Sequence, residues 1–310
     1  MKARREARFA GVRVACAPLA VLAVATCVPK LTNDDALVTA TRVLAVKAEP
    51  AEAAPGATVT FTALVASPQG TVGDAPVGWA FCSAPKPITE DNVVSNACLD
   101  AASLSGAGTG PSVTTQTPPA GCSLFGPDTS STAFRPRDPD ATGGFYQPLL
   151  ALLPGTVPAV ELARIHCDLP DADAAAASAF AASYQLNQNP TLLPLTATQG
   201  GASVDLTSPV AAGTRLVLEA AWPASSAETF AYFDPGTENV EGQRESMQVA
   251  WYTSAGSLDT ESTGRASGDM ATTSDDGWVT PSATGTVHLW VVLRDNRGGV
   301  DFASVDVVVE

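Results

Sequence analysis

Two stretches of this 310-residue chain repeat the same order of strand and turn signals, and this repeat constrains the fold more than any other feature. In residues 43–65 a short apolar strand, a turn rich in Pro and Gly, and a strand of alternating apolar and polar residues follow one another. The same order recurs in residues 204–222. Alternation of this kind predicts strands with one buried face. The 25 Gly and 24 Pro of the chain also favour short strands and turns over long helices.

Each copy carries two further landmarks in the same order. Val77 and Trp79 form a Val-x-Trp pattern in the first copy, and Val249 and Trp251 repeat it in the second. A corner composed of an acidic residue, Gly, an aromatic residue and Pro then precedes an apolar run in both copies. Three landmarks in one order indicate two copies of one all-β unit.

This order resembles that of immunoglobulin-like β-sandwiches, and the second copy is similar to the PKD-like branch found in bacterial surface proteins. The resemblance implies that Trp79 and Trp251 fill the space between two sheets as core residues. We therefore predict an all-β chain with two immunoglobulin-like β-sandwich domains in tandem, at residues 41–203 and 204–310. These motifs are structural, and the fold hosts many functions.

The first domain is predicted to carry a loop insertion and one α-helix. Residues 103–132 are rich in Gly, Pro, Ser and Thr, which is typical of an exposed loop. Residues 170–186 are rich in Ala and predict a helix of about four turns, with Asp168 or Asp171 as its N-cap. We expect this helix to pack across an end of the first sandwich.

Residues 1–26 have the features of a secretory signal peptide: a basic start, an apolar segment and small residues at its end. Residues 24–27 (VATC) resemble a bacterial lipoprotein signal, in which a cysteine after a small residue carries the lipid. This resemblance implies a lipid on Cys27, a tether over residues 27–40 and export to the outer membrane. Residues 23–25 (AVA) support the competing interpretation, which is ordinary cleavage without a lipid.

Cysteine parity favours the lipid. One of the six cysteines lies in the leader, and lipidation of Cys27 leaves four, a number that forms two disulfides in an oxidising compartment. Cys82 and Cys167 each end a strand, and we expect the two strands to be antiparallel, which places these cysteines at opposite edges. Of the three possible pairings we favour Cys82–Cys98 with Cys122–Cys167. A metal–thiolate site is the rival interpretation, although the chain has no C-x-x-C pair.

The net charge of −15 argues against nucleic-acid partners, because an acidic surface repels phosphates. A second interpretation of the acidic composition is a calcium site. Asp138, Asp140, Asp275 and Asp276 occupy equivalent corners of the two copies, and carboxylate oxygens from such loops are ligands of Ca²⁺. The simpler interpretation is that these acids form turns. We expect no other cofactor.

The sequence shows little sign of catalysis, and we predict that the protein is not an enzyme. His166 and His288 both lie in predicted strands, where a sheet-face residue with a local hydrogen bond is the simplest interpretation. The chain contains no H-E-x-x-H, G-x-S-x-G or Walker-type pattern. Residues 228–246 mix aromatic and acidic residues and are predicted to form a long loop or an extra hairpin.

These observations favour a non-catalytic cell-envelope lipoprotein: a surface or periplasmic module for binding, adhesion or structure, with an unknown protein or glycan partner and a lipid anchor in the membrane. The alternative is a carbohydrate-binding or cryptic hydrolase module that uses the first-domain insertion. A hydrolase would need His166 or an acid pair to line a cleft. A role in a larger assembly would need a free edge strand, for which residues 303–310 are a candidate.

Overall fold

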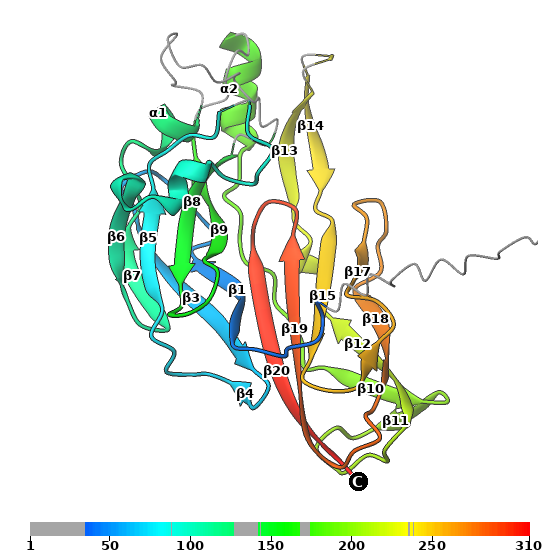
Figure 1. Cartoon of the computed structure of the whole chain (residues 1–310). Coiled ribbons are helices and arrows are strands. Elements are labelled where there is room, and N and C mark those ends of the chain that lie inside the picture. The colour runs from blue at the N-terminus through cyan, green and yellow to red at the C-terminus, as the bar shows by residue number, and fades with distance from the viewer. Residues whose placement is uncertain are drawn as a thin grey trace, which may run out of the picture. The chain divides into compact units, whose positions relative to one another are not determined.

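The computed structural model describes residues 35–87, 89–126, 142, 144–167, 174–234, 236–237 and 239–310. Over these residues the chain is all-β, and its strands form two immunoglobulin-like sandwiches in which two sheets enclose an apolar core (Figure 1). The predicted fold class is therefore confirmed.

The first sandwich combines a four-stranded sheet with a five-stranded sheet. The four-stranded sheet contains β1 (Arg42–Glu49), β3 (Thr58–Ser67), β4 (Gly70–Thr71) and β7 (Ser112–Gln116). The five-stranded sheet runs in the order β2 (Glu52–Ala53), β9 (Ala159–His166), β8 (Gly144–Leu152), β5 (Gly78–Cys82) and β6 (Leu104–Thr109). Trp79 on β5 is buried between the sheets, and its Nε1 donates to the Gly110 carbonyl at 2.8 Å.

Much of the segment predicted as an exposed loop is regular structure instead. Strand β6 pairs with β5 and strand β7 pairs with β3, so residues 104–116 extend both sheets of the first sandwich. Two 3₁₀ turns (Asn96–Leu99 and Ala101–Ser103) precede them and the short helix α1 (Gly121–Phe125) follows. Turn-type composition concealed these strands because Gly, Ser and Thr also suit strands at the edge of a sheet.

The two strands that lead to Cys82 and Cys167 were predicted to be antiparallel, and this prediction is wrong. Strands β5 and β9 both run antiparallel to β8 and are therefore parallel to each other. Cys82 and Cys167 are separated because β8 lies between their strands. The disulfides are Cys82–Cys98 and Cys122–Cys167, the two pairs favoured from the sequence.

The second sandwich also has two sheets. One runs in the order β11 (Ala202–Val204), β10 (Thr196–Gln199), β12 (Arg215–Ala221), β18 (Thr273–Val279) and β16 (Ser257–Leu258). The other runs in the order β17 (Ser262–Arg265), β15 (Met247–Thr253), β19 (Gly285–Asp295) and β20 (Val300–Val309), with β20 at an edge. Trp251 on β15 is buried in the core, and its Nε1 donates to Thr263 Oγ1 at 2.8 Å.

The boundary between the sandwiches lies earlier than the predicted residues 203/204. Strand β10 pairs with both β11 and β12, so the second sandwich already includes residues 196–199. Periodicity did not reveal this strand, because it is only four residues long.

Helix α2 (Ala174–Ser183) lies within the predicted range, and its suggested caps, Asp168 and Asp171, are outside the described residues. The expected packing of this helix on the first sandwich is corrected. Phe180 packs against Ala231 and Phe233 of a two-stranded hairpin, whose strands are β13 (Thr229–Asp234) and β14 (Asn239–Arg244). The 3₁₀ turn Ala224–Ser226 precedes the hairpin.

Strand β19 is buried on both faces, and each face packs in a different apolar cluster. This strand therefore lies at the interface between the two sandwiches. Leu289 and Val291 face the core of the second sandwich, whereas Trp290 and Val292 pack with apolar residues of β1 and β3. A strand buried on both sides has a nearly continuous apolar sequence. The sequence HLWVVL in this strand fits that rule.

The N-terminal end of the described chain docks on the second sandwich. Val38 is fully buried, its backbone N–H donates to the Thr253 carbonyl at 2.8 Å, and the Thr253 N–H donates to the Ala36 carbonyl at 2.9 Å. Residues 36–38, which the prediction placed in the tether over residues 27–40, are therefore packed on the second sandwich; residues 27–34 lie outside the described residues.

Candidate functional site

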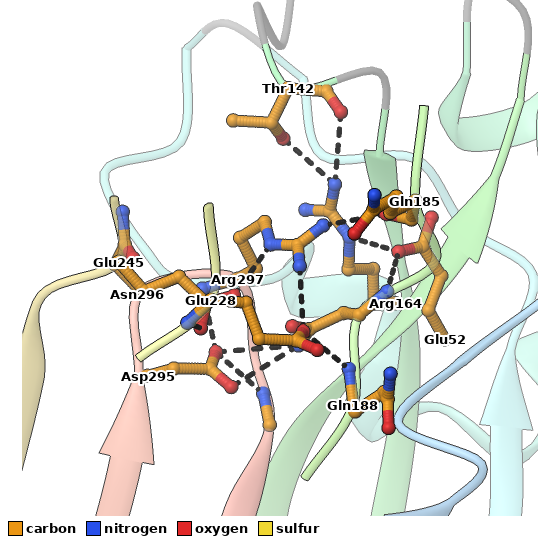
Figure 2. Close-up of polar contacts among 12 residues, drawn as sticks. Glu52, Thr142, Arg164, Gln185, Gln188, Glu228, Glu245, Asp295, Asn296 and Arg297 are labelled. Carbon is orange, nitrogen blue, oxygen red and sulfur yellow. Dashed lines mark hydrogen bonds and ion pairs between the residues drawn. The ribbon is translucent and has the colours of Figure 1, made fainter. Parts of the chain in front are cut away.

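The segment between α2 and β10, residues 184–195, links the two sandwiches, and we call it the linker. A network of buried charges surrounds the linker, and we call this network the linker clasp (Figure 2). It consists of side chains from both sandwiches and from the connection after α2: Glu52, Arg164, Tyr184, Asn187, Glu228, Glu245, Asp295 and Arg297. None of these residues was predicted as a site residue by itself, although Glu228 and Glu245 lie in the segment 228–246, which stands out in the sequence for its aromatic and acidic residues.

Asn187 connects the two halves of the linker clasp. Its backbone N–H donates to Glu52 Oε2 at 2.9 Å, and its Nδ2 lies 3.3 Å from both carboxylate oxygens of Asp295. Two residues later, Asn189 Nδ2 donates to the Ala48 carbonyl at 2.7 Å, while its Oδ1 accepts from the Val300 N–H at 2.9 Å. The linker is thus hydrogen-bonded to both sandwiches.

In the first half of the clasp, Arg164 pairs with Glu52. Arg164 Nε lies 2.9 Å from Glu52 Oε2, and neither side chain is exposed. Burial and the negative charge of Glu52 raise the pKa of Tyr184, so its hydroxyl stays protonated and donates to Glu52 Oε1. His166 stacks on Tyr184 with ring centroids 4.3 Å apart, and its Nδ1 lies 3.8 Å from Glu52 Oε1.

In the second half of the clasp, Arg297 is the central cation. Its Nε lies 2.6 Å from Glu245 Oε1, its Nη2 lies 3.0 Å from Glu228 Oε2, and its Nη1 donates to the Gln185 carbonyl at 2.9 Å (Figure 2). The guanidinium also lies 4.7 Å from the centre of the Phe230 ring. The side chains of Arg297 and Glu245 are 1% and 0% exposed, so water does not screen this pair.

The second half of the clasp contains more carboxylates than cations. Burial and the neighbouring charge of Asp295 raise the pKa of Glu245 to about 7, although the hydrogen bond and charge of Arg297 lower it. Burial also raises the pKa of Asp295. Glu245 therefore changes its protonation near neutral pH, which makes the linker clasp sensitive to pH.

A cavity of about 340 Å³ lies at one end of the first sandwich, and we call it the end cavity. It is lined by Phe81, Cys82, Ser83, Ser105, Gly106, Thr115, Gln116, Thr117, Pro118, Pro119, Leu124 and Gln147. Eight of these twelve residues belong to the first-domain insertion, so the structure places a cavity where the sequence analysis located the carbohydrate-binding alternative. The end cavity is separate from His166, which faces the linker clasp.

Strand register explains why the end cavity is polar. Val113 pairs with Phe61, and both face the core, so Thr115 two residues later also faces inward, opposite Val59. On the other sheet, Ser105 pairs with the inward-facing Phe81. Polar side chains thus replace apolar ones at the last inward-facing positions of the sandwich.

The predicted histidine and acid sites do not converge on one place. His288 Nδ1 lies 2.7 Å from Asp306 Oδ1 on the neighbouring strand, which fits the predicted local hydrogen bond. Asp275 and Asp276 are consecutive on β18 and point to opposite faces. Asp276 is buried, which raises its pKa, and it accepts hydrogen bonds from Thr260.

Because Asp275 and Asp276 point to opposite faces of β18, they do not together form the predicted calcium site. Asp138 and Asp140 lie outside the described residues, and across the described ranges no group of three or more His, Cys, Asp or Glu side chains is placed to hold a metal ion. Cys27 also lies outside the described residues, so its lipid is still a prediction.

The fold and the two disulfides define the class: a protein of two immunoglobulin-like sandwiches suited to an extracellular or periplasmic compartment. Within the described part of the chain, no helix is long and apolar enough to cross a membrane. No protein-family model matches the chain, and no curated protein matches it.

Comparison with solved structures returns many matches of low similarity. A Salmonella alpha-2-macroglobulin mutant is 11% identical with a TM-score of 0.23, and the match covers 88% of this chain and 15% of that one. The Yersinia pseudotuberculosis adhesin InvE is 14% identical (TM-score 0.22, 86% and 58% covered), and red sea bream transglutaminase is 14% identical (TM-score 0.24, 88% and 32% covered). The chain spans less than two thirds of each, and these likenesses identify no function.

Proposed function

We propose that this protein is a non-catalytic module of the cell envelope, held to the outer membrane by a lipid on Cys27, that presents its two sandwiches as one unit to a binding partner. The observation that carries the proposal is the linker clasp. Hydrogen bonds of the linker join both sandwiches, and a buried ion pair in each sandwich supports them, as expected for a protein that holds a recognition surface in a fixed position.

The alternative functions use the first-domain insertion. The end cavity favours binding of a small ligand over hydrolysis, because none of the twelve described residues that line it is a histidine or a carboxylate that could act as acid or base. His166 instead lies beside Glu52 and Tyr184 in a structural network. The preferred function is therefore a binding module.

The experiment that tests the anchor is an intact mass of protein extracted from membranes, before and after reduction and alkylation. The expected mass begins at Cys27, carries acyl chains and contains two disulfides. Cys27→Ala should move the protein from the membrane fraction to the soluble fraction, whereas the matched variant Cys16→Ala, inside the leader, should stay in the membrane. An unacylated mass beginning at Thr26 would reject the anchor.

A further inference from the structure

The end cavity holds hydrogen-bonding capacity that the protein itself does not use. Thr117 donates its hydroxyl to the Ala54 carbonyl at 3.0 Å, and Ser83 donates to the Ser103 carbonyl at 3.1 Å. In contrast, the side chains of Ser105, Thr115 and Gln116 make no hydrogen bond with the described residues. Three polar groups are therefore available to a ligand.

Gln147 adds a fourth polar group from the wall of the end cavity. Its side chain is fully buried, and its Nε2 donates to the Cys82 carbonyl at 2.6 Å, which identifies the other atom of the amide as the oxygen. That oxygen, Oε1, has no donor in the described part of the chain. A buried acceptor without a donor costs free energy, and because Gln147 lies in the cavity wall without exposed surface, its amide is suited to report a bound ligand rather than to contact it.

The lining also limits the charge of a ligand. None of the twelve residues that line the end cavity is charged, and the chain as a whole carries a net charge of −15. Among the described residues that line the cavity, an anion would find no cation and a cation would find no carboxylate, and the acidic protein would also repel an anion. A neutral ligand fits this environment best.

Apolar surfaces complete the end cavity. Phe81, Pro118, Pro119 and Leu124 lie among the polar residues that line it. A flat C–H surface packs against such residues while its hydroxyl groups reach the polar side chains. The volume of about 340 Å³ lies at the lower end of the range for ligand pockets.

We propose that the end cavity binds a neutral, polyhydroxylated ligand of the size of one or two sugar rings. This inference rests on the proposed function as a binding module and specifies its ligand. The side chains of Ser105, Thr115 and Gln116 would bind the ligand hydroxyls, and the two prolines with Phe81 would pack against its apolar face.

The test uses the purified, oxidised mature protein and neutral disaccharides: maltose, cellobiose and diacetylchitobiose. Digalacturonate serves as the anionic probe. Isothermal titration calorimetry gives the affinity, and two-dimensional NMR follows the side-chain amides of Gln147 and Gln116. We expect at least one neutral disaccharide to shift these amide signals and digalacturonate to leave them unchanged.

Two variants fill the end cavity from opposite sheets, Thr115→Trp and Ser105→Trp. Each should weaken binding at least tenfold while thermal unfolding shows that the protein stays folded. The matched control is Thr114→Trp, because Thr114 neighbours Thr115 on β7 but is exposed on the opposite face, and its affinity should equal that of the wild type.

The proposal is overturned if no neutral disaccharide shifts the Gln147 signal, if digalacturonate binds equally well, or if both folded cavity-filling variants bind as tightly as the control. These results do not depend on the anchor. An acylated Cys27 in a protein that binds no sugar would reject this ligand alone, whereas sugar binding by a protein without acyl chains would reject the anchor alone.

Discussion

The two sandwiches share a plan but fill their interiors differently. The core of the second contains Trp222, Trp251 and Trp278, whereas the core of the first contains a single tryptophan, Trp79, together with five buried alanines. Both disulfides also lie in the first sandwich. A core of small side chains buries less apolar area, and covalent links offset that loss. The first sandwich thus combines a core of smaller side chains and two cross-links with a cavity at one end.

The linker clasp couples the two sandwiches, so the stability of one is not independent of the other. Breaking it should therefore have the largest effect. Arg297→Met leaves the Glu245 carboxylate buried without its cation, and we expect the free energy of unfolding to fall by about 3–5 kcal/mol. Urea titration followed by circular dichroism measures this loss. Hydrogen exchange should then show the two sandwiches opening separately.

The matched control for this prediction is Arg215→Met. Arg215 pairs with Asp259 on the surface, where both side chains are about half exposed and water screens the pair, so its loss should leave the free energy of unfolding nearly unchanged. Equal midpoints for the two variants would show that the linker clasp does not hold the sandwiches together.

Removal of a disulfide sharpens the contrast between the sandwiches. The double variant Cys122→Ala/Cys167→Ala should lower the free energy of unfolding by about 2–4 kcal/mol, because this bond spans 45 residues. The variant Cys82→Ala/Cys98→Ala should lose less, since that bond spans 16 residues. Hydrogen exchange should rise near α1 and β9 and stay unchanged in β12 and β18. Faster exchange in the second sandwich would contradict the assignment of the disulfides to local support of the first.

The parts of the fold that could be predicted from the sequence are those that follow a local pattern of residues. Alternation located β3, the Val-x-Trp landmarks located Trp79 and Trp251, and the four cysteines that remain after Cys16 and Cys27 are set aside pointed to two disulfides. Prediction from the sequence failed where tertiary context decides. Strands β6 and β7 have loop-like composition, and α2 is apolar on no particular side, so its partner was not readable from its sequence.

The candidate sites were harder to predict because their residues are far apart in the chain. Glu52 and Arg164 are separated by 112 positions, and Arg297 and Glu245 by 52. Each looks like an ordinary surface charge in the sequence, and only strand pairing brings the partners together. One signal was available: HLWVVL is apolar at consecutive positions, which indicates a strand buried on both faces and therefore an interface between the sandwiches.

The smallest effect is a pH dependence that arises between the sandwiches rather than in either core. The folded-state pKa of Glu245 is about 7, above the ordinary value of 4.5, so the folded protein binds more protons than the unfolded chain between these values. The stability that this group contributes is therefore fully present below about pH 4.5 and is lost as the pH rises to about 7, by at most about 3 kcal/mol. Denaturant titrations from pH 5 to pH 8 measure the slope.

Substitution separates the contribution of Glu245 from that of a partly buried acid, Glu161. Burial raises the pKa of Glu161 on β9 to about 7 as well, against the charge of Arg294, and its effect on stability has the same sign. Glu245→Gln should remove part of the slope and Glu161→Gln another part, because each amide is neutral at every pH in the range. If both variants keep the full slope, or if wild-type stability rises from pH 5 to pH 8, then buried carboxylates are not what makes the junction of the two sandwiches sensitive to pH.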